Sequence, residues 1–351
     1  MKMKYLYKSA FICGLLAIAA GVFSCKNSEQ DFPDFDYTTG YFPYQYPVRT
    51  LILGNYIYDN ANDNAHKFVI SAAIGGVREN SQDRICRFVV DESLCDNAFF
   101  SDDSPILPLP ANYYSLSDNE KIVIAEGQLN GGIEVQLTEA FFNDPLAIGN
   151  AYVVPLRITG VTDLDTILQG QPLGINADRR IAGDWSVSPK DFTMFAVKFI
   201  NPYHGAYLYE GQASLSGGAT EDSTYRAKFV EENEVVKMQT TGRTTVLING
   251  LSFKSKALTG FFNLELLFDS DEYTAEGGVN CRVQAPQGVA YTITGTGRYA
   301  IDAETYGGQK HDAVYLTYTV DHGTFHYAAT DKFVFRDKGI VMEVYDLKVK
   351  N

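Results

Sequence analysis

Cys25 is the residue with the clearest chemical context, because it ends an N-terminal segment of the kind that directs export. Lys2, Lys4 and Lys8 give this segment a basic start, and residues 10–23 form an apolar run. The run is too short to cross a membrane. We therefore predict that residues 1–24 are a signal peptide and that the thiol of Cys25 receives lipid after cleavage.

The junction Val22-Phe23-Ser24-Cys25 resembles the lipobox of Gram-negative lipoproteins. The alternatives are a secretory signal that is cleaved nearby or an apolar helix that stays in place. With Cys25 lipidated, we expect a protein anchored to the outer membrane on the cell surface, with the periplasmic face as the alternative. Residues 25–39 are mostly polar and acidic, as in a flexible tether.

Paired carboxylates could hydrolyse a glycosidic bond, but the recognisable spacing is missing. A family 18 glycosidase would carry Asp-x-x-Asp-x-Asp-x-Glu, whereas the nearest acidic cluster, residues 269–272, is followed by Tyr273. The chain has no Gly-x-Ser-x-Gly elbow, and Gly295-Thr296-Gly297 lacks the third glycine of a dinucleotide fingerprint. We therefore predict no catalytic residues and no cofactor. A surface glycosidase with an unrecognised carboxylate pair is the alternative.

Metal-binding patterns are weak as well. His322 and His326 are four residues apart, but they flank Gly323 in a predicted turn and have no third ligand close in sequence. Residues 59–64 lack the central glycine and distal glutamate of an EF-hand loop. We expect no metal site.

Aromatic side chains remain as candidates for ligand contact, because a sugar ring has an apolar face that packs on Trp or Tyr. Six candidate ligand-binding residues lie near Gly, Asn or Asp at predicted strand ends: Trp185, Tyr203, His204, Tyr207, Tyr209 and Tyr306. Packing in the core is the alternative role for each of them.

Without its signal peptide the chain is strongly acidic. Three of the 29 basic residues lie in residues 1–24, which leaves 26 basic against 43 acidic residues and a formal charge of about −17. Lys and Arg are not clustered, which argues against nucleic acid and anionic lipid headgroups as partners. Neutral ligands carry no such penalty.

Cysteine use fits export without depending on it. Cys13 lies in the signal peptide and Cys25 takes the lipid, so Cys86, Cys95 and Cys281 remain. A disulfide between Cys86 and Cys95 is possible in an oxidising compartment, but the sequence does not show whether the geometry allows it.

Short β-strands must position these side chains in residues 40–165. In one of them Ile133, Val135 and Leu137 alternate with polar residues and share one face. The candidate strands are residues 48–53, 67–73, 86–91, 113–116, 121–125, 133–138 and 152–159. Seven such strands indicate an immunoglobulin-like β-sandwich. Pro155 should lie at an edge or a bulge, because it cannot donate to a central ladder.

Residues 166–183 have no periodic pattern and are predicted to be a linker. After it, residues 184–351 return to β-prone runs: 193–200, 206–215, 225–230, 235–240, 244–248, 262–268, 279–283, 291–301, 313–320, 325–335 and 340–345. Gly295 and Gly297 interrupt an apolar face, where glycine permits a bend or a close backbone approach. The pattern indicates a lipocalin-like antiparallel β-barrel, so the chain is predicted to be all-β.

Particular segments also resemble a known family. Leu109-Pro110, residues 113–116 and residues 152–158 resemble the immunoglobulin-like N-terminal domain of Bacteroidetes-type glycan-utilisation surface lipoproteins, a module also found before family 18 endoglycosidases. Residues 188–193, 201–205 and 330–337 resemble the lipocalin-like C-terminal domain of unknown function that is paired with it.

The resemblance implies a non-catalytic surface lipoprotein that binds an oligo- or polysaccharide for polysaccharide capture and uptake. It also implies an outer-membrane glycan transport complex as a partner. A structural or adhesive surface subunit is one alternative, and carriage of a small apolar molecule inside an open barrel is another. The sequence does not name the glycan.

Overall fold

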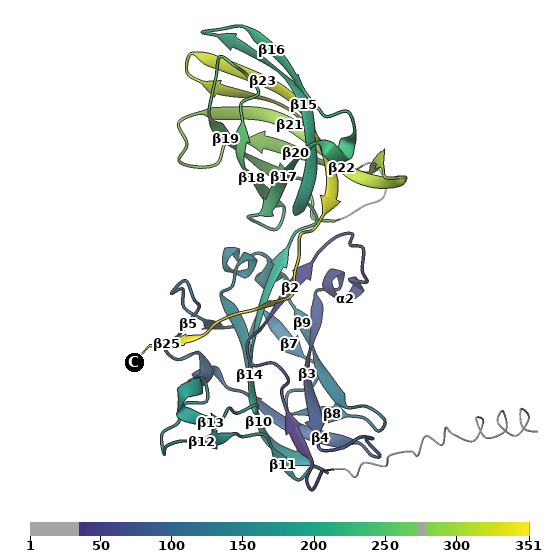
Figure 1. Ribbon diagram of the computed structural model, residues 1–351, viewed down its shortest axis with the longest axis vertical. Coiled ribbons are helices and arrows are strands. Elements are labelled where there is room, and N and C mark those ends of the chain that lie inside the picture. Colours follow the sequence, from purple (N-terminus) through teal and green to yellow (C-terminus); the bar gives the residue numbers. More distant parts are fainter. Residues whose placement is uncertain (1–34, 273–277, 351) are drawn as a thin grey trace, which may run out of the picture. The chain divides into compact units, whose positions relative to one another are not determined.

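The computed structural model describes residues 35–272 and 278–350, and strands make up nearly all of its regular structure (Figure 1). The predicted all-β class is confirmed. Within these two ranges, no helix has both the length and the apolar character needed to cross a membrane. The signal peptide, Cys25 and residues 26–34 of the tether lie outside the described residues, and the expectations for them stay predictions.

Two sheets form the first region of the fold. One sheet has the order β11 (Thr166–Ile167), β1 (Thr39–Tyr41), β3 (Lys67–Gly75), β9 (Asn130–Leu137) and β7 (Tyr114–Leu116). The other has the order β24 (Glu343–Val344), β2 (Pro47–Ile52), β14 (Phe192–Ile200), β10 (Tyr152–Thr162), β4 (Arg84–Val90) and β8 (Lys121–Ile124), with β6 (Leu107–Pro108) paired to β10. The seven strands predicted in residues 40–165 are all present.

Alternating apolar residues give each of these sheets a buried face. In β9, the side chains of Ile133, Val135 and Leu137 are buried, as their spacing predicts. They share one core cluster with Phe68 of β3 and Phe88 of β4. Because this cluster draws on both sheets, the sheets pack face to face, and the predicted sandwich is confirmed.

Pro155 does not lie at the edge or bulge that we expected. It belongs to β10, which runs between β14 and β4. Its carbonyl accepts the backbone N–H of Asp91 at 2.9 Å, and β4 ends one residue earlier at Val90. The N–H and C=O of a strand residue point to the same side, so the donor that proline lacks would face the place where β4 stops.

The helices of the described residues are short. They are α2 (Ala61–Asn64), α3 (Glu139–Phe142) and 3-10 turns at Glu92–Cys95, Pro145–Ile148, Ala182–Asp184 and Val230–Glu232. Asp63 in α2 is buried and forms an ion pair with Arg49. Asp63, one of the two acidic residues of the polar segment 59–64, therefore has a structural role.

The second region is a closed barrel of eight strands, which confirms the predicted barrel. The strand order is β15 (Gly205–Gly217), β17 (Glu234–Thr240), β18 (Thr245–Ser252), β19 (Phe261–Phe268), β20 (Val279–Gln284), β21 (Thr292–Tyr306), β22 (Gln309–His322) and β23 (Phe325–Asp337). β23 pairs with β15 along its length and closes the barrel. β16 (Glu221–Tyr225) pairs with the second half of β15, beyond the part that pairs with β17.

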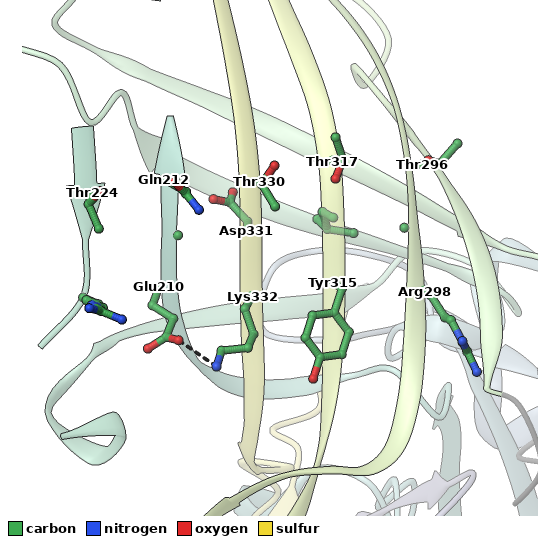
Figure 2. A pocket seen from close by; sticks show the side chains of 14 residues that line it. Glu210, Gln212, Thr224, Thr296, Arg298, Tyr315, Thr317, Thr330, Asp331 and Lys332 are labelled. Carbon is green, nitrogen blue, oxygen red and sulfur yellow. Dashed lines mark ion pairs between the residues drawn. The ribbon is translucent and has the colours of Figure 1, made fainter. Parts of the chain in front are cut away.

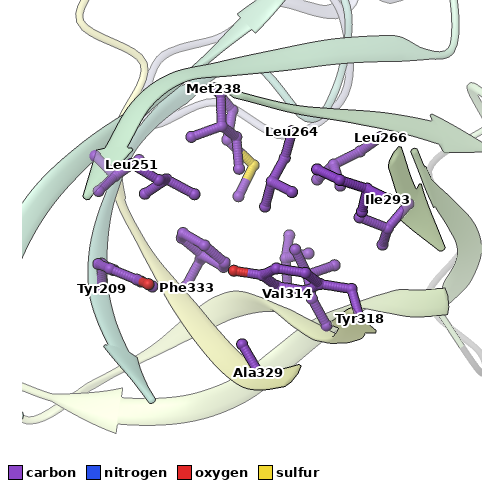
Figure 3. Close-up of a cluster of buried hydrophobic side chains, with 14 of the residues drawn as sticks. Tyr209, Met238, Leu251, Leu264, Leu266, Ile293, Val314, Tyr318, Ala329 and Phe333 are labelled. Atoms are coloured by element: carbon purple, nitrogen blue, oxygen red, sulfur yellow. The ribbon is translucent and has the colours of Figure 1, made fainter. Parts of the chain in front are cut away.

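Apolar side chains pack the inside of the barrel (Figure 3). Met238, Leu264 and Phe333 are inaccessible to solvent. Gly295 does permit the close approach that we predicted, because a Cβ there would lie 2.4 Å from the Cβ of Tyr318 on β22. The packed interior opposes carriage of a small apolar molecule.

The barrel is inserted into the chain of the sandwich. β14 precedes the barrel and β24 follows it, and both strands pair with β2. β25 (Lys348–Val349) then pairs with β5 (Ala98–Phe99). The predicted barrel domain of residues 184–351 is therefore wrong at both ends, since residues 192–200 and 343–344 complete a sheet of the sandwich. The physical reason is that a strand joins the sheet that supplies its hydrogen bonds, which need not be the next one along the chain.

The predicted linker of residues 166–183 also contains paired strands. β11 pairs in parallel with β1, and β12 (Gln171–Pro172) pairs with β13 (Trp185–Val187). Two-residue strands carry no periodic pattern, so the sequence did not reveal them. The strand predicted over residues 225–230 is wrong as well, because β16 ends at Tyr225.

Cys86 and Cys95 do not form the disulfide considered from the sequence, and both are free thiols. Cys86 is buried in the sandwich core, whereas Cys95 packs against a different cluster that contains Leu94 and Phe100. Burial raises the pKa of Cys86 to about 11 and that of Cys95 to about 12. Both thiols are therefore protonated and unreactive near neutral pH.

Tyr345 fastens the C-terminal segment to the sandwich. Its hydroxyl donates to the carbonyl of Met194 at 2.8 Å, and its buried ring packs edge-on against Tyr46 and Phe100. We expect Tyr345→Ala to lower the free energy of unfolding by about 3 kcal/mol, because it opens a cavity in a packed cluster. Urea unfolding followed by the fluorescence of the single tryptophan, Trp185, measures this loss.

Val344→Ala is the matched control, since Val344 precedes Tyr345 and is 70% exposed. It should change the unfolding midpoint very little. Equal losses in the two variants would contradict the role given to the Tyr345 ring.

Candidate functional site

Three of the six candidate ligand-binding residues are core residues of the barrel. Tyr203, Tyr207 and Tyr209 are each at most 2% exposed. The ring of Tyr203 stacks on Phe268 with 3.6 Å between centroids, and the ring of Tyr209 stacks on Phe333 at 4.8 Å. For these three the binding prediction is wrong, because a ring enclosed by the core cannot meet a ligand at the surface.

The other three candidates lie apart from one another. Trp185 is on β13, and its indole N–H donates to the carbonyl of Asp178 at 2.7 Å. His204 accepts the backbone N–H of Thr240 at 3.1 Å, and burial lowers its pKa to about 4. Tyr306 stacks on His311 at 3.7 Å at the far end of β21. The structure does not unite them in one site, and a ligand role for each stays a prediction.

A groove on the outer surface of the barrel brings a different set of side chains together (Figure 2). It is open to solvent, has a volume of about 600 Å³, and crosses β16, β15, β23, β22 and β21. We call it the barrel groove. Its outward-facing side chains are Glu210, Gln212, Thr224, Arg226, Thr296, Arg298, Tyr315, Thr317, Thr330 and Lys332.

These side chains form two rows across the strands, set by the pairing register. The groove floor is the row of directly paired residues Thr224, Gln212, Thr330, Thr317 and Thr296. The groove wall is the row of paired residues Glu210, Lys332, Tyr315 and Arg298, together with Arg226 directly after β16. Residues two apart on a strand share a face, so β15, β23, β22 and β21 each contribute one residue to each row.

Lys332 organises the groove wall electrostatically. Its ammonium lies 2.7 Å from a carboxylate oxygen of Glu210 and 3.1 Å from one of Glu304. Partial burial works to lower the pKa of Lys332, but the hydrogen bonds to these two carboxylates outweigh it and raise the pKa. The hydroxyl of Tyr315 donates to Glu304 at 2.6 Å and completes the network.

The same network disfavours proton transfer by Glu210. Burial acts to raise the pKa of Glu210, but hydrogen bonds from Lys332 and Asn233 prevail and lower it. A carboxylate held in its ionised form is a poor general acid for a glycosidic oxygen. In residues 35–272 and 278–350, no three His, Cys, Asp or Glu side chains are grouped to hold a metal.

Asp331 supports the groove from inside the barrel. It is 1% exposed, and it accepts hydrogen bonds from Tyr318 at 2.7 Å, Tyr209 at 3.3 Å and Tyr225. Tyr225 ends β16, so this bond ties the edge strand of the groove to β23. A Cβ on Gly211 would lie 2.4 Å from the Asp331 carboxylate, which explains glycine at that position.

The sequence contained part of the signal for this groove. Apolar and polar residues alternate over 313–320 and 292–298, so Tyr315, Thr317, Thr296 and Arg298 could be placed on outward faces. The positions of β16 and β23 beside β15 could not be read from that alternation, because a period of two selects a face and not a neighbouring strand.

Two models of protein families match the chain. The model described as "-like, N-terminal domain" matches residues 35–165, and the model described as "Domain of unknown function (DUF5627)" matches residues 202–339. The second match spans the barrel from β15 to β23. No curated protein matches the chain.

Solved structures from Bacteroides resemble the chain to different degrees. A Bacteroides ovatus protein of unknown function is 38% identical with a TM-score of 0.83, and the match covers 90% of this chain and 100% of that one. An auxiliary nutrient binding protein from Bacteroides thetaiotaomicron is 12% identical with a TM-score of 0.40, covering 82% of this chain and 90% of that one.

The fold defines a class of all-β protein in which a closed barrel is inserted into a sandwich. Within that class, the chain belongs to the family of the Bacteroides ovatus protein of unknown function, with which it shares the fold over nearly its whole described length.

Asp331 should make the stability of the barrel depend on pH. Burial raises its pKa from 3.8 to about 6, although hydrogen bonds from the three tyrosines act in the opposite direction. The folded state therefore holds the proton more tightly than the unfolded state. The resulting stabilisation is complete below about pH 4 and is lost as the pH rises through about 6.

Asp331→Asn removes this ionisation while keeping the shape of the side chain. The unfolding free energy of the variant minus that of the wild type should be larger at pH 7 than at pH 4, by on the order of 3 kcal/mol. Urea unfolding of both proteins at the two pH values measures this difference. A difference that is the same at both pH values would contradict the assignment.

Proposed function

We propose that this protein is a non-catalytic glycan-binding protein and that the barrel groove is its binding site. The observation that carries the proposal is the combination of the two rows: a partly buried aromatic ring and charged hydrogen-bonding groups lie beside a floor of threonine hydroxyls and a glutamine amide. Both kinds of group lie on rigid strands, so their side chains lose little conformational entropy on binding.

A sugar is matched by both parts of the groove. The apolar face of a pyranose packs on an aromatic ring, and Tyr315 offers the aromatic ring of the groove wall. The hydroxyls of a sugar both donate and accept hydrogen bonds, as do the hydroxyls of the threonines on the groove floor. The groove is open and shallow rather than a closed apolar pocket, which suits a polymer better than a small apolar ligand.

The overall charge of the chain favours a neutral glycan over a polyanion, while the groove wall itself holds Arg226, Arg298 and Lys332 beside Glu210. Lys332 and Glu210 carry opposite charges and pair with each other at 2.7 Å. The chain without residues 1–24 has a formal charge of about −17, which opposes long-range attraction of a polyanion.

We propose further that the protein acts at the cell surface. Cys25 is lipidated, and the lipid holds the protein on the outer membrane at the cell surface, where it captures polysaccharide for an outer-membrane glycan transport complex. The lipobox-like junction and the basic and apolar segment before it support this. Many copies on one surface would bind a long polymer more strongly than each site alone.

Tyr315→Ala tests the groove. We expect calorimetric titration with a panel of neutral polysaccharides to show binding by the wild type, and the variant to bind at least tenfold more weakly because the stacking surface is lost. Phe261→Ala is the matched control, since Phe261 is an aromatic residue on β19 that is 73% exposed and lies outside the groove.

Two results would overturn the groove as a glycan site. One is a wild type that binds no polysaccharide of the panel, and the other is an equal loss of binding in the Tyr315 and Phe261 variants. Release of reducing ends from any polysaccharide would instead favour the glycosidase alternative.

Cys25→Ala tests the anchor. We expect the full-length variant, produced in a Bacteroides host, to move from the membrane fraction to the soluble fraction, because its lipid-bearing thiol is missing. Cys95→Ala keeps Cys25 and should stay with the membranes. A Cys25 variant that remains membrane-bound would refute lipid anchoring at this residue.

A further inference from the structure

We infer that the barrel groove binds an internal stretch of a linear, extended glycan that runs across the strands, with one sugar unit over each of the five strands. The inference rests on the proposed function and deepens it, because it specifies the shape and the length of the ligand. It predicts recognition of the middle of a chain rather than of a chain end.

The pairing register supplies the repeat. Gln212 is paired with Thr224 on one side and with Thr330 on the other, and Thr317 is paired with Thr330 and with Thr296. Neighbouring strands are about 4.8 Å apart, so equivalent side chains recur at that distance across the sheet. Successive units of an extended β-linked sugar polymer recur on nearly the same length.

Each of the strands β15, β23, β22 and β21 supplies a wall residue and a floor residue two positions apart, and Arg226 follows the end of β16. On β23 these are Lys332 and Thr330, and on β22 they are Tyr315 and Thr317. A sugar unit over one strand therefore meets one group from the groove wall and one from the groove floor. In Figure 2 the labelled side chains of the two rows lie at two levels along the strands.

The hollow extends over the full width of the five strands. The groove of about 600 Å³ reaches from Thr224 on β16 to Thr296 on β21. A second hollow of about 390 Å³ continues from the floor toward Ser214 and Thr319, and the two share Gln212, Thr224, Thr317 and Thr330. This second hollow lies beside the floor along the strands, where the side chains are small. At the ends of the row, Thr224 is on the edge strand β16, and Thr296 is paired with the exposed Arg282 of β20, so neither end of the row is enclosed.

The two ends of the row are held in place from inside the barrel. On β16, Tyr225 next to Thr224 donates to the buried carboxylate of Asp331. On β21, Gly297 next to Thr296 lets the strand approach β22, since a Cβ there would lie 2.4 Å from the side chain of Leu316. The five positions are therefore preorganised at a constant spacing.

A length series tests the inference. The probes are linear oligosaccharides, from the dimer upward, made by partial hydrolysis of the polysaccharide that the wild type binds best. Affinity measured by calorimetry should rise with each unit up to about five, the number of strands crossed, and then level off. Threonine-to-valine changes at the ends, Thr224→Val and Thr296→Val, should weaken binding of the pentamer several-fold more than binding of the dimer.

Thr330→Val, in the middle of the floor, should weaken binding at every length, whereas Thr305→Val is the control on an exposed part of β21 outside the groove. Valine has the shape of threonine, and equal thermal midpoints would show that all variants fold. Affinity that is constant from the dimer upward, while Tyr315→Ala still weakens binding at least tenfold, would overturn the inference and leave the proposed function standing. A wild type that binds no glycan would overturn both.

Discussion

The pairing of β23 with β15 is the constraint on which the barrel and its groove depend. It closes the sheet, so the apolar faces of all eight strands are enclosed, and only the short strand β16 is left as an edge beside β15. A shift of this register by one residue would exchange the inward and outward faces of β23. A slip would turn Asp331 to solvent and force Lys332 into the core, because neighbouring residues of a strand face opposite sides. The contact of Asp331 with three tyrosines therefore specifies the register as well as joining strands.

The insertion of the barrel into the sandwich explains why the C-terminal segment returns to the N-terminal half of the chain. β2 pairs with β14 on one side and with β24 on the other, so the sheet needs strands from before and after the barrel. Tyr345 contributes more to this closure than the two-residue strand β24, because a buried ring removes far more apolar surface from water than the partly buried Glu343 and the exposed Val344. The sandwich is thus complete only after the barrel and β24 have been made.

Exposure separates the groove from the aromatic clusters of the barrel. The barrel contains many tyrosines, but those on β15 and β23 point inward, where their rings fill the core. Among them, the hydroxyl of Tyr209 donates to Asp331. Tyr315 lies on the opposite face of β22 from Tyr318, and this difference of three positions decides which ring a ligand can reach. The ion pair of Glu210 with Lys332 adds little stability at a partly exposed position, so its main effect is to orient polar groups along the groove wall.

The sequence by itself determined the all-β class, most strands and the face on which each side chain lies, because alternation with a period of two is a local property. That pattern already placed Tyr207 and Tyr209 on the same face as Ala213 and Leu215, a sign of core packing that glycine-rich surroundings obscured. Only the tertiary structure decided that β14 joins the sandwich, that Cys86 and Cys95 lie in separate clusters, and that β16, β15, β23, β22 and β21 align their side chains in two rows. The reason is physical. Neighbouring strands are selected by closure of the sheet and burial of its faces, which depend on residues more than a hundred positions apart.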